Sequence, residues 1–159
     1  MKKRFLCILL ALFIVLSFLP AMSTAADGTP VAVPSKTNFV MDGKPVSITQ
    51  AYNINGYNHF QLRTVAELLN GTAAQFNVYW DGKYAIIETG KPYHGTATPA
   101  ALKPTYNVRK SNTSFKLDGA IIKFENAYLI DGGTNYVQLR ELADKLKGTA
   151  SQFSVYWDA

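Results

Sequence analysis

The stretch GTAAQFNVYWD at residues 71–81 decides the fold, because it returns almost unchanged as GTASQFSVYWD at residues 148–158. Each copy begins with a glycine, which can end a helix, and continues into an alternating Phe-x-Val-x-Trp pattern, which predicts a strand. A stretch that recurs at a fixed spacing indicates an internal repeat. The sequence therefore predicts a tandem arrangement of two similar units.

The residues before the first copy predict three strands. Residues 37–41 form the first, Asp42-Gly43 is a hairpin turn, and residues 44–54 form the return strand. A third short strand is expected over residues 58–62, after a turn at Asn55-Gly56. This part of each unit is therefore expected to be an antiparallel meander.

A helix is predicted next, because Leu62, Val65, Ala66 and Leu69 fall at helical spacing. Thr64 with Glu67 could form a capping box at its start.

In the strand that follows, alternation predicts that Phe76, Val78 and Trp80 face the core and that Tyr79 faces outward. Asp81-Gly82 turns the chain into a fifth strand over residues 83–89, so the unit reads β-β-β-α-β-β.

The second unit follows the same order but stops at Ala159, before any equivalent of the fifth strand. A missing strand would leave the preceding strand with an open edge, which favours pairing with another chain. We expect either that the chain continues in a longer protein, which we prefer, or that another molecule supplies the strand, including by self-association through this open edge.

The predicted fold class is α+β, with two tandem repeats that each form an antiparallel sheet with one packed helix. The first repeat spans residues 37–90 and the second, incomplete, spans residues 113–159. Residues 26–36 and 91–112 are rich in Pro, Thr and Ala, and we expect them to be a spacer and a linker.

The first 25 residues predict a signal peptide. Three basic residues precede the apolar run of residues 5–19, and Ser23-Thr24-Ala25 fits cleavage after Ala25. We expect a secreted or cell-surface protein that meets the membrane only through this segment before cleavage. Removal of Lys2, Lys3 and Arg4 reduces the formal net charge from +5 to about +2, which argues against nucleic acid as a partner.

The pattern NHFQLRTVA at residues 58–66, followed by FNVYWD at residues 76–81 and by a second copy over residues 135–158, resembles the copper amine oxidase N-terminal-like, or stalk, domain family. The resemblance implies two tandem α+β modules of the kind found in secreted and surface proteins of Gram-positive bacteria. It does not imply oxidase activity. In the enzyme that gave the family its name, the copper and the quinone cofactor belong to a separate catalytic domain.

The residues themselves predict no catalytic, cofactor or metal site. The two histidines, His59 and His94, lie on different predicted elements without cysteine ligands nearby, and the aspartates fall at turns. Neither a nucleophile motif nor a phosphate-binding glycine loop is present in the sequence. We therefore expect a protein that is not an enzyme.

The candidate binding residues are three tyrosines expected at the surface, Tyr57, Tyr79 and Tyr156, because exposed tyrosines can stack on sugars or anchor a partner protein. Arg63 and Arg140 occupy matching positions, and we expect them to bind loop carbonyls or a turn aspartate, with an anionic ligand as the alternative. The expected function is a non-catalytic spacer or interaction module that binds a cell-wall glycan or a surface protein. The alternative is the N-terminal accessory region of a larger secreted enzyme, such as a hydrolase.

Overall fold

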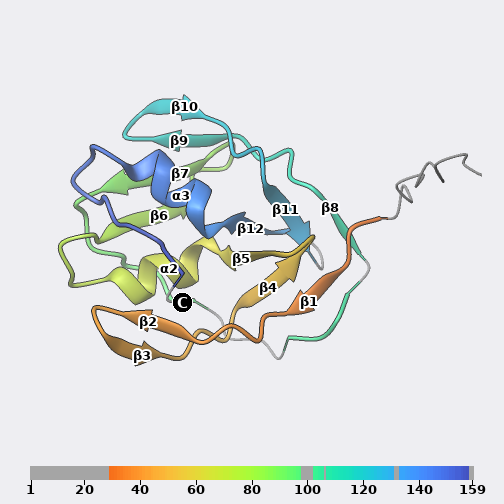
Figure 1. Cartoon of the computed structure of the whole chain (residues 1–159). Helices are drawn as coiled ribbons and strands as arrows, with labels where there is room; N and C mark the ends of the chain where they lie inside the picture. The colour runs from red at the N-terminus through yellow and green to blue at the C-terminus, as the bar shows by residue number, and fades with distance from the viewer. Residues whose placement is uncertain (1–28, 98–101, 106, 131–132, 158–159) are drawn as a thin grey trace, which may run out of the picture.

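The structure is a computed structural model that describes residues 29–97, 102–105, 107–130 and 133–157. Within these residues it is an α+β protein in which two short helices pack against β-sheets (Figure 1). The predicted signal peptide lies outside the described residues. None of the described helices has the length and apolar character needed to cross a membrane.

The first half contributes seven strands and one helix: β1 (Ala32–Pro34), β2 (Phe39–Met41), β3 (Lys44–Val46), β4 (Ala51–Ile54), β5 (Tyr57–Gln61), α2 (Leu62–Leu69), β6 (Phe76–Trp80) and β7 (Ala85–Thr89). The second half contributes five strands and one helix: β8 (Val108–Lys110), β9 (Phe115–Leu117), β10 (Ala120–Ile122), β11 (Ala127–Ile130), β12 (Thr134–Gln138) and α3 (Leu139–Leu146). The elements from β1 to α2 thus recur as β8 to α3, shifted by 76 or 77 residues.

A six-stranded antiparallel sheet runs through both halves in the order β1-β4-β5-β12-β11-β8. Its centre is the pairing of β5 with β12, in which Phe60 lies opposite Val137 and Gln61 opposite Tyr136. The two halves therefore share one continuous sheet.

A second sheet also combines strands from both halves, in the order β10-β9-β7-β6. In it β7 runs parallel to β9, whereas the other neighbours are antiparallel. The strands β2 and β3 form a separate two-stranded hairpin. The expectation of one antiparallel sheet inside each repeat is therefore wrong, because both larger sheets are assembled between the halves.

The two segments expected to be spacers are part of the fold where the structure describes them. Residues 32–34 form the edge strand β1 and residues 108–110 form the opposite edge strand β8. Ala32, Tyr93, Ala97 and Val108 are buried, so proline-rich composition here marks sheet edges and packed turns rather than a free tether.

The predicted return strand over residues 44–54 is two strands in different sheets. Strand β3 stays in the hairpin with β2, whereas β4 lies between β1 and β5 in the six-stranded sheet. The predicted capping box is also wrong, because the helix begins directly after β5, with Gln61 as its N-cap and no side-chain cap. Thr64 is therefore already inside the helix.

The core lies on one face of the six-stranded sheet, between that sheet, the helices and the four-stranded sheet. The predicted stripe of α2 is confirmed, since Leu62, Val65, Ala66 and Leu69 are all buried. They pack in one cluster with Phe60, Phe76, Phe115, Val137, Leu142 and Leu146. Because strand side chains alternate between faces, Tyr136 lies on the opposite face, in a smaller cluster with Ala32, Tyr52, Ile54, Val108, Tyr128 and Ile130.

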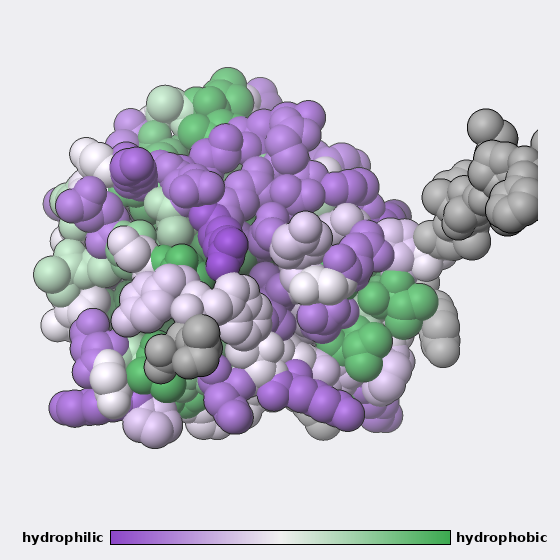
Figure 2. All heavy atoms as spheres, viewed as in Figure 1, coloured by the Kyte–Doolittle hydropathy of each residue, from purple (hydrophilic) through white to green (hydrophobic). Residues whose placement is uncertain are grey.

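The surface in the view of Figure 2 is mostly hydrophilic, with hydrophobic side chains at its top, over β9 and β10, and a second group at the lower right. Ile121 of β10 is 70% exposed. Strand β10 is an edge strand of the four-stranded sheet.

Candidate functional site

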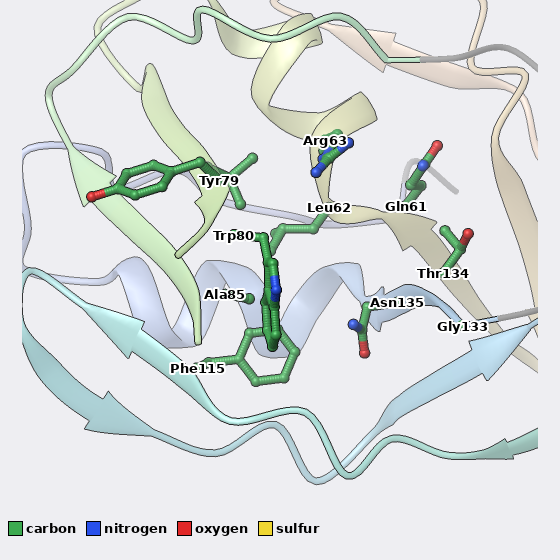
Figure 3. A pocket seen from close by; sticks show the side chains of 11 residues that line it. Gln61, Leu62, Arg63, Tyr79, Trp80, Ala85, Phe115, Gly133, Thr134 and Asn135 are labelled. Atoms are coloured by element: carbon green, nitrogen blue, oxygen red, sulfur yellow. The ribbon is translucent and has the colours of Figure 1, made fainter. Parts of the chain in front are cut away.

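A groove of about 260 Å³ lies where the ends of β6 and the start of α2 meet the start of β12 (Figure 3). Its walls come from both halves of the chain and comprise Gln61, Leu62, Arg63, Val78, Tyr79, Trp80, Ala85, Phe115, Gly133, Thr134 and Asn135. The groove therefore exists only because β7 joins β9 and β5 joins β12.

Trp80 is the main aromatic surface in the groove. The sequence predicts that it faces the core, but 52% of the residue is exposed. The reason is its place at the end of β6: Val78 is the last residue of that strand face to be buried, and the turn begins at Asp81. Figure 3 shows the indole across the middle of the groove, beside Phe115 and Ala85. The position next to a turn is the signal in the sequence that could have placed it at the surface.

Arg63 is exposed at the first turn of α2 and borders the groove. Among the described residues, no hydrogen bond or ion pair holds its guanidinium, and the same is true of Arg140. The expected bond to a turn aspartate is not formed in the case of Asp81. That carboxylate instead accepts the backbone N–H groups of Tyr84 and Lys83, at 2.6 and 2.8 Å. These bonds lower the pKa of Asp81 and fix the turn.

Further polar groups of the groove flank Arg63. The side-chain oxygen of Gln61 accepts a long hydrogen bond of 3.4 Å from the Thr64 hydroxyl. In the part of the chain that the structure describes, nothing accepts a bond from the Gln61 amide nitrogen. Arg63, Gln61 and Thr134 therefore line the same groove as the exposed tryptophan.

Asn135, although it lines the groove, has a structural role. It accepts a hydrogen bond from Ser111 Oγ and donates one of 2.9 Å to Thr113 Oγ1. Asn58 makes the same pair of contacts with Ser35 and Thr37, at 2.7 and 2.9 Å. This repeated asparagine therefore ties β5 and β12 to the segments that lead from β1 to β2 and from β8 to β9.

The three predicted tyrosines are at the surface, with exposed fractions of 59% for Tyr57, 42% for Tyr79 and 82% for Tyr156. Only Tyr79 lines the groove, and in Figure 3 its ring extends away from Arg63 and Trp80. Tyr57 and Tyr156 are not among the groove residues. The structure thus does not bring the three tyrosines together in this groove.

His59 is buried in the six-stranded sheet, where its Nδ1 lies 2.9 Å from the carbonyl oxygen of Tyr57 and its ring packs edge-on against Tyr128. Its Nε2 has no hydrogen-bond partner among the described residues, and burial lowers the pKa of the imidazole. His94 is exposed on another segment. Across the described ranges, no three His, Cys, Asp or Glu side chains come together as a metal site would require.

A second hollow of about 230 Å³ borders the other side of α2, with Ser47, Gln50, Thr64, Glu67, Leu68 and Ala97 in its walls together with Ile48 and Thr49. None of these lining residues is aromatic, so the groove at Trp80 is the better candidate for ligand binding.

Comparison with other proteins adds no further assignment, since no protein-family model, curated protein or solved structure matches the chain.

Proposed function

We propose that the protein is an exported, non-catalytic interaction module of the bacterial cell surface, and that its groove binds a cell-wall glycan. The observation that carries this proposal is the pairing of a half-exposed Trp80 with an unpartnered Arg63 in one groove. An aromatic face can stack on the apolar face of a sugar ring, while a few placed polar groups set orientation.

Arg63 favours a glycan that bears carboxylates. A guanidinium pairs with a carboxylate through two parallel hydrogen bonds, and the groove contributes no acidic side chain that would compete. Gln61 and Thr134 would then bond to sugar hydroxyl groups.

Export rests on the predicted signal peptide, and the repeated motif supports membership of the stalk-domain family. Within that proposal the chain consists of two related α+β repeats. If the chain is instead the accessory region of a larger secreted enzyme, the same groove would hold that enzyme on the cell-wall glycan.

Pelleting with purified cell-wall sacculi tests the proposal. Trp80→Ala should weaken retention about fivefold or more, because it removes roughly 1–2 kcal/mol of apolar contact with the sugar ring, and Arg63→Met should weaken it severalfold. Arg140→Met is the matched control, since Arg140 occupies the corresponding helix position outside the groove. Retention of Trp80→Ala and Arg63→Met at the level of the unmodified protein would refute the proposed site.

A further inference from the structure

The turn that precedes β11 is held by a side chain of α3. The carboxylate of Glu141, in the first turn of that helix, accepts the backbone N–H groups of Glu125 and Asn126, at 2.6 and 2.8 Å. Hydrogen bonds to an ionised acceptor are stronger than those between neutral groups. In the second half of the chain, two consecutive N–H groups thus bind a carboxylate that the helix itself supplies.

The backbone that precedes β4 in the first half is attached in the same way. The carbonyl of Gln50 accepts the N–H of Gln61 at 3.3 Å, and the carbonyl of its counterpart Asn126 accepts the N–H of Gln138 at 3.2 Å. In each half this bond joins the turn to the residue directly before the helix. The two turns therefore lie at the same place relative to α2 and α3.

The two halves differ in the helix residue that faces this turn. Thr64 stands at the position of Glu141, and its hydroxyl donates to Gln61 at 3.4 Å. Within the described residues, the N–H of Thr49, the counterpart of Glu125, donates to no acceptor. The hollow of about 230 Å³ lies here, with Thr49 and Thr64 in its walls. This hollow therefore takes the place that the Glu141 carboxylate fills in the second half.

The other polar groups of the hollow discriminate among carboxylates. The hydroxyl groups of Ser47 and Thr49 are available in its walls as donors to an anion. Glu67 lies in the same wall one helical turn after Thr64, about 5 Å along the helix axis. Its charge disfavours a second anionic group on the ligand and favours a positive one at that distance.

We propose that the hollow between residues 47–50 and α2 binds a small ligand that carries one carboxylate and one amino group, as an ω-amino acid does. The ligand carboxylate accepts the N–H of Thr49, as Glu141 accepts that of Glu125, and the ligand ammonium pairs with Glu67. A volume of about 230 Å³ suits a ligand smaller than the drug-sized molecules that occupy larger pockets. The site is separate from the groove at Trp80 and does not depend on glycan binding there.

Heteronuclear amide NMR of the full chain, titrated with γ-aminobutyrate, tests the proposal. The amide resonance of Thr49 should shift saturably, because its N–H gains a charged acceptor. The amide of Glu125 is the internal control, since its N–H already bonds to Glu141, and it should remain in place.

Thr64→Glu should reproduce the second half, because the introduced carboxylate reaches the N–H of Thr49. Binding of γ-aminobutyrate should then fall about tenfold or more, as expected when a ligand loses a hydrogen bond between its charged group and the protein. The melting temperature should rise by a few degrees. Ala73→Glu is the matched control: it adds the same charge at an exposed position after α2 and should leave binding unchanged.

Two further comparisons do not depend on the folding of Thr64→Glu. With the unmodified protein, butylamine, which has no carboxylate, should leave the Thr49 resonance in place. Glu67→Gln should weaken the binding of γ-aminobutyrate severalfold but should not weaken that of butyrate, which has no amino group.

The proposal would be overturned if γ-aminobutyrate caused no saturable shift at Thr49, or if Thr64→Glu bound it as well as the unmodified protein does. An equal shift with butylamine would show that the hollow does not recognise a carboxylate. Equal weakening of butyrate and γ-aminobutyrate by Glu67→Gln would show that the amino group does not pair with Glu67, and the assigned ligand class would be wrong.

Discussion

The hydroxyl of Ser151 accepts a 2.8 Å hydrogen bond from the backbone N–H of Gly90 and donates one to the backbone carbonyl of Gln75. Ser151 is fully buried after α3 in the second half, whereas Gly90 and Gln75 flank the β6–β7 pair of the first half. One side chain thus ties the end of the second helix to the hairpin of the other half.

Ser151→Ala should lower the free energy of unfolding by about 1 kcal/mol, the usual net contribution of one hydrogen bond. The loss is moderate because the Gly90 N–H also donates to Gln75 at 3.1 Å, and that bond remains. Urea denaturation measures this change in the free energy of unfolding. Ser154→Ala, at an exposed position three residues later, is the control and should change nothing; a loss of equal size there would contradict the assigned role of Ser151.

Stability should fall between pH 7.5 and 5.5 because of His59. Burial lowers the pKa of this imidazole below its ordinary value of 6.5, and the hydrogen bond to Tyr57 offsets only part of that effect. The unfolded chain therefore binds the proton first as the pH falls, so stability is complete above about pH 7 and decreases through 6.5 toward the lowered pKa of the folded state.

The urea midpoint measured across this range checks the expectation. His59→Phe should remove most of the slope, whereas His94→Gln, which changes the exposed histidine, should retain it. An unchanged slope in His59→Phe would show that another group is responsible.

Gly95→Ala should destabilise the protein by about 1–3 kcal/mol, the usual cost of overpacking. A Cβ at this position would lie 2.6 Å from Cζ and 2.9 Å from Cε2 of Tyr93. The Tyr93 ring has little room to move, because the residue is 5% exposed and Asn70 binds its backbone N–H and carbonyl at 2.9 and 3.1 Å.

Thermal unfolding measures the effect of this substitution, which should lower the melting temperature by several degrees. Thr96→Ala at the exposed next residue is the control. In a Tyr93→Leu background the cost of Gly95→Ala should shrink. If Gly95→Ala has no effect in the unmodified protein, then the segment after β7 does not pack as described.

The local elements could be predicted from the sequence because their signals are local. The stripe of Leu62, Val65 and Ala66 defines α2, and Asp42-Gly43 defines a hairpin whose turn residues have positive φ, as expected. Both kinds of pattern depend only on neighbouring residues.

The pairing of distant strands could not be predicted, because it depends on contacts between the halves. Strands β1 and β8 have three residues each, lie in proline-rich segments and pair with β4 and β11, respectively. The groove around Trp80 likewise follows from the joining of β7 to β9 and of β5 to β12. The candidate tyrosines were predicted at the surface correctly, but surface position alone does not define a common site.

The central pairing of β5 with β12 also sets the order in which the chain can fold. Gln61 and Tyr136 are neighbours in the sheet but are separated by some 75 residues, which a ribosome adds in about 4–15 s. Until β12 has left the ribosome, β5 can pair with β4 but not with β12, and the six-stranded sheet cannot form. The six-stranded sheet is therefore expected to form only after β12 has left the ribosome, in a slow step dominated by long-range contacts.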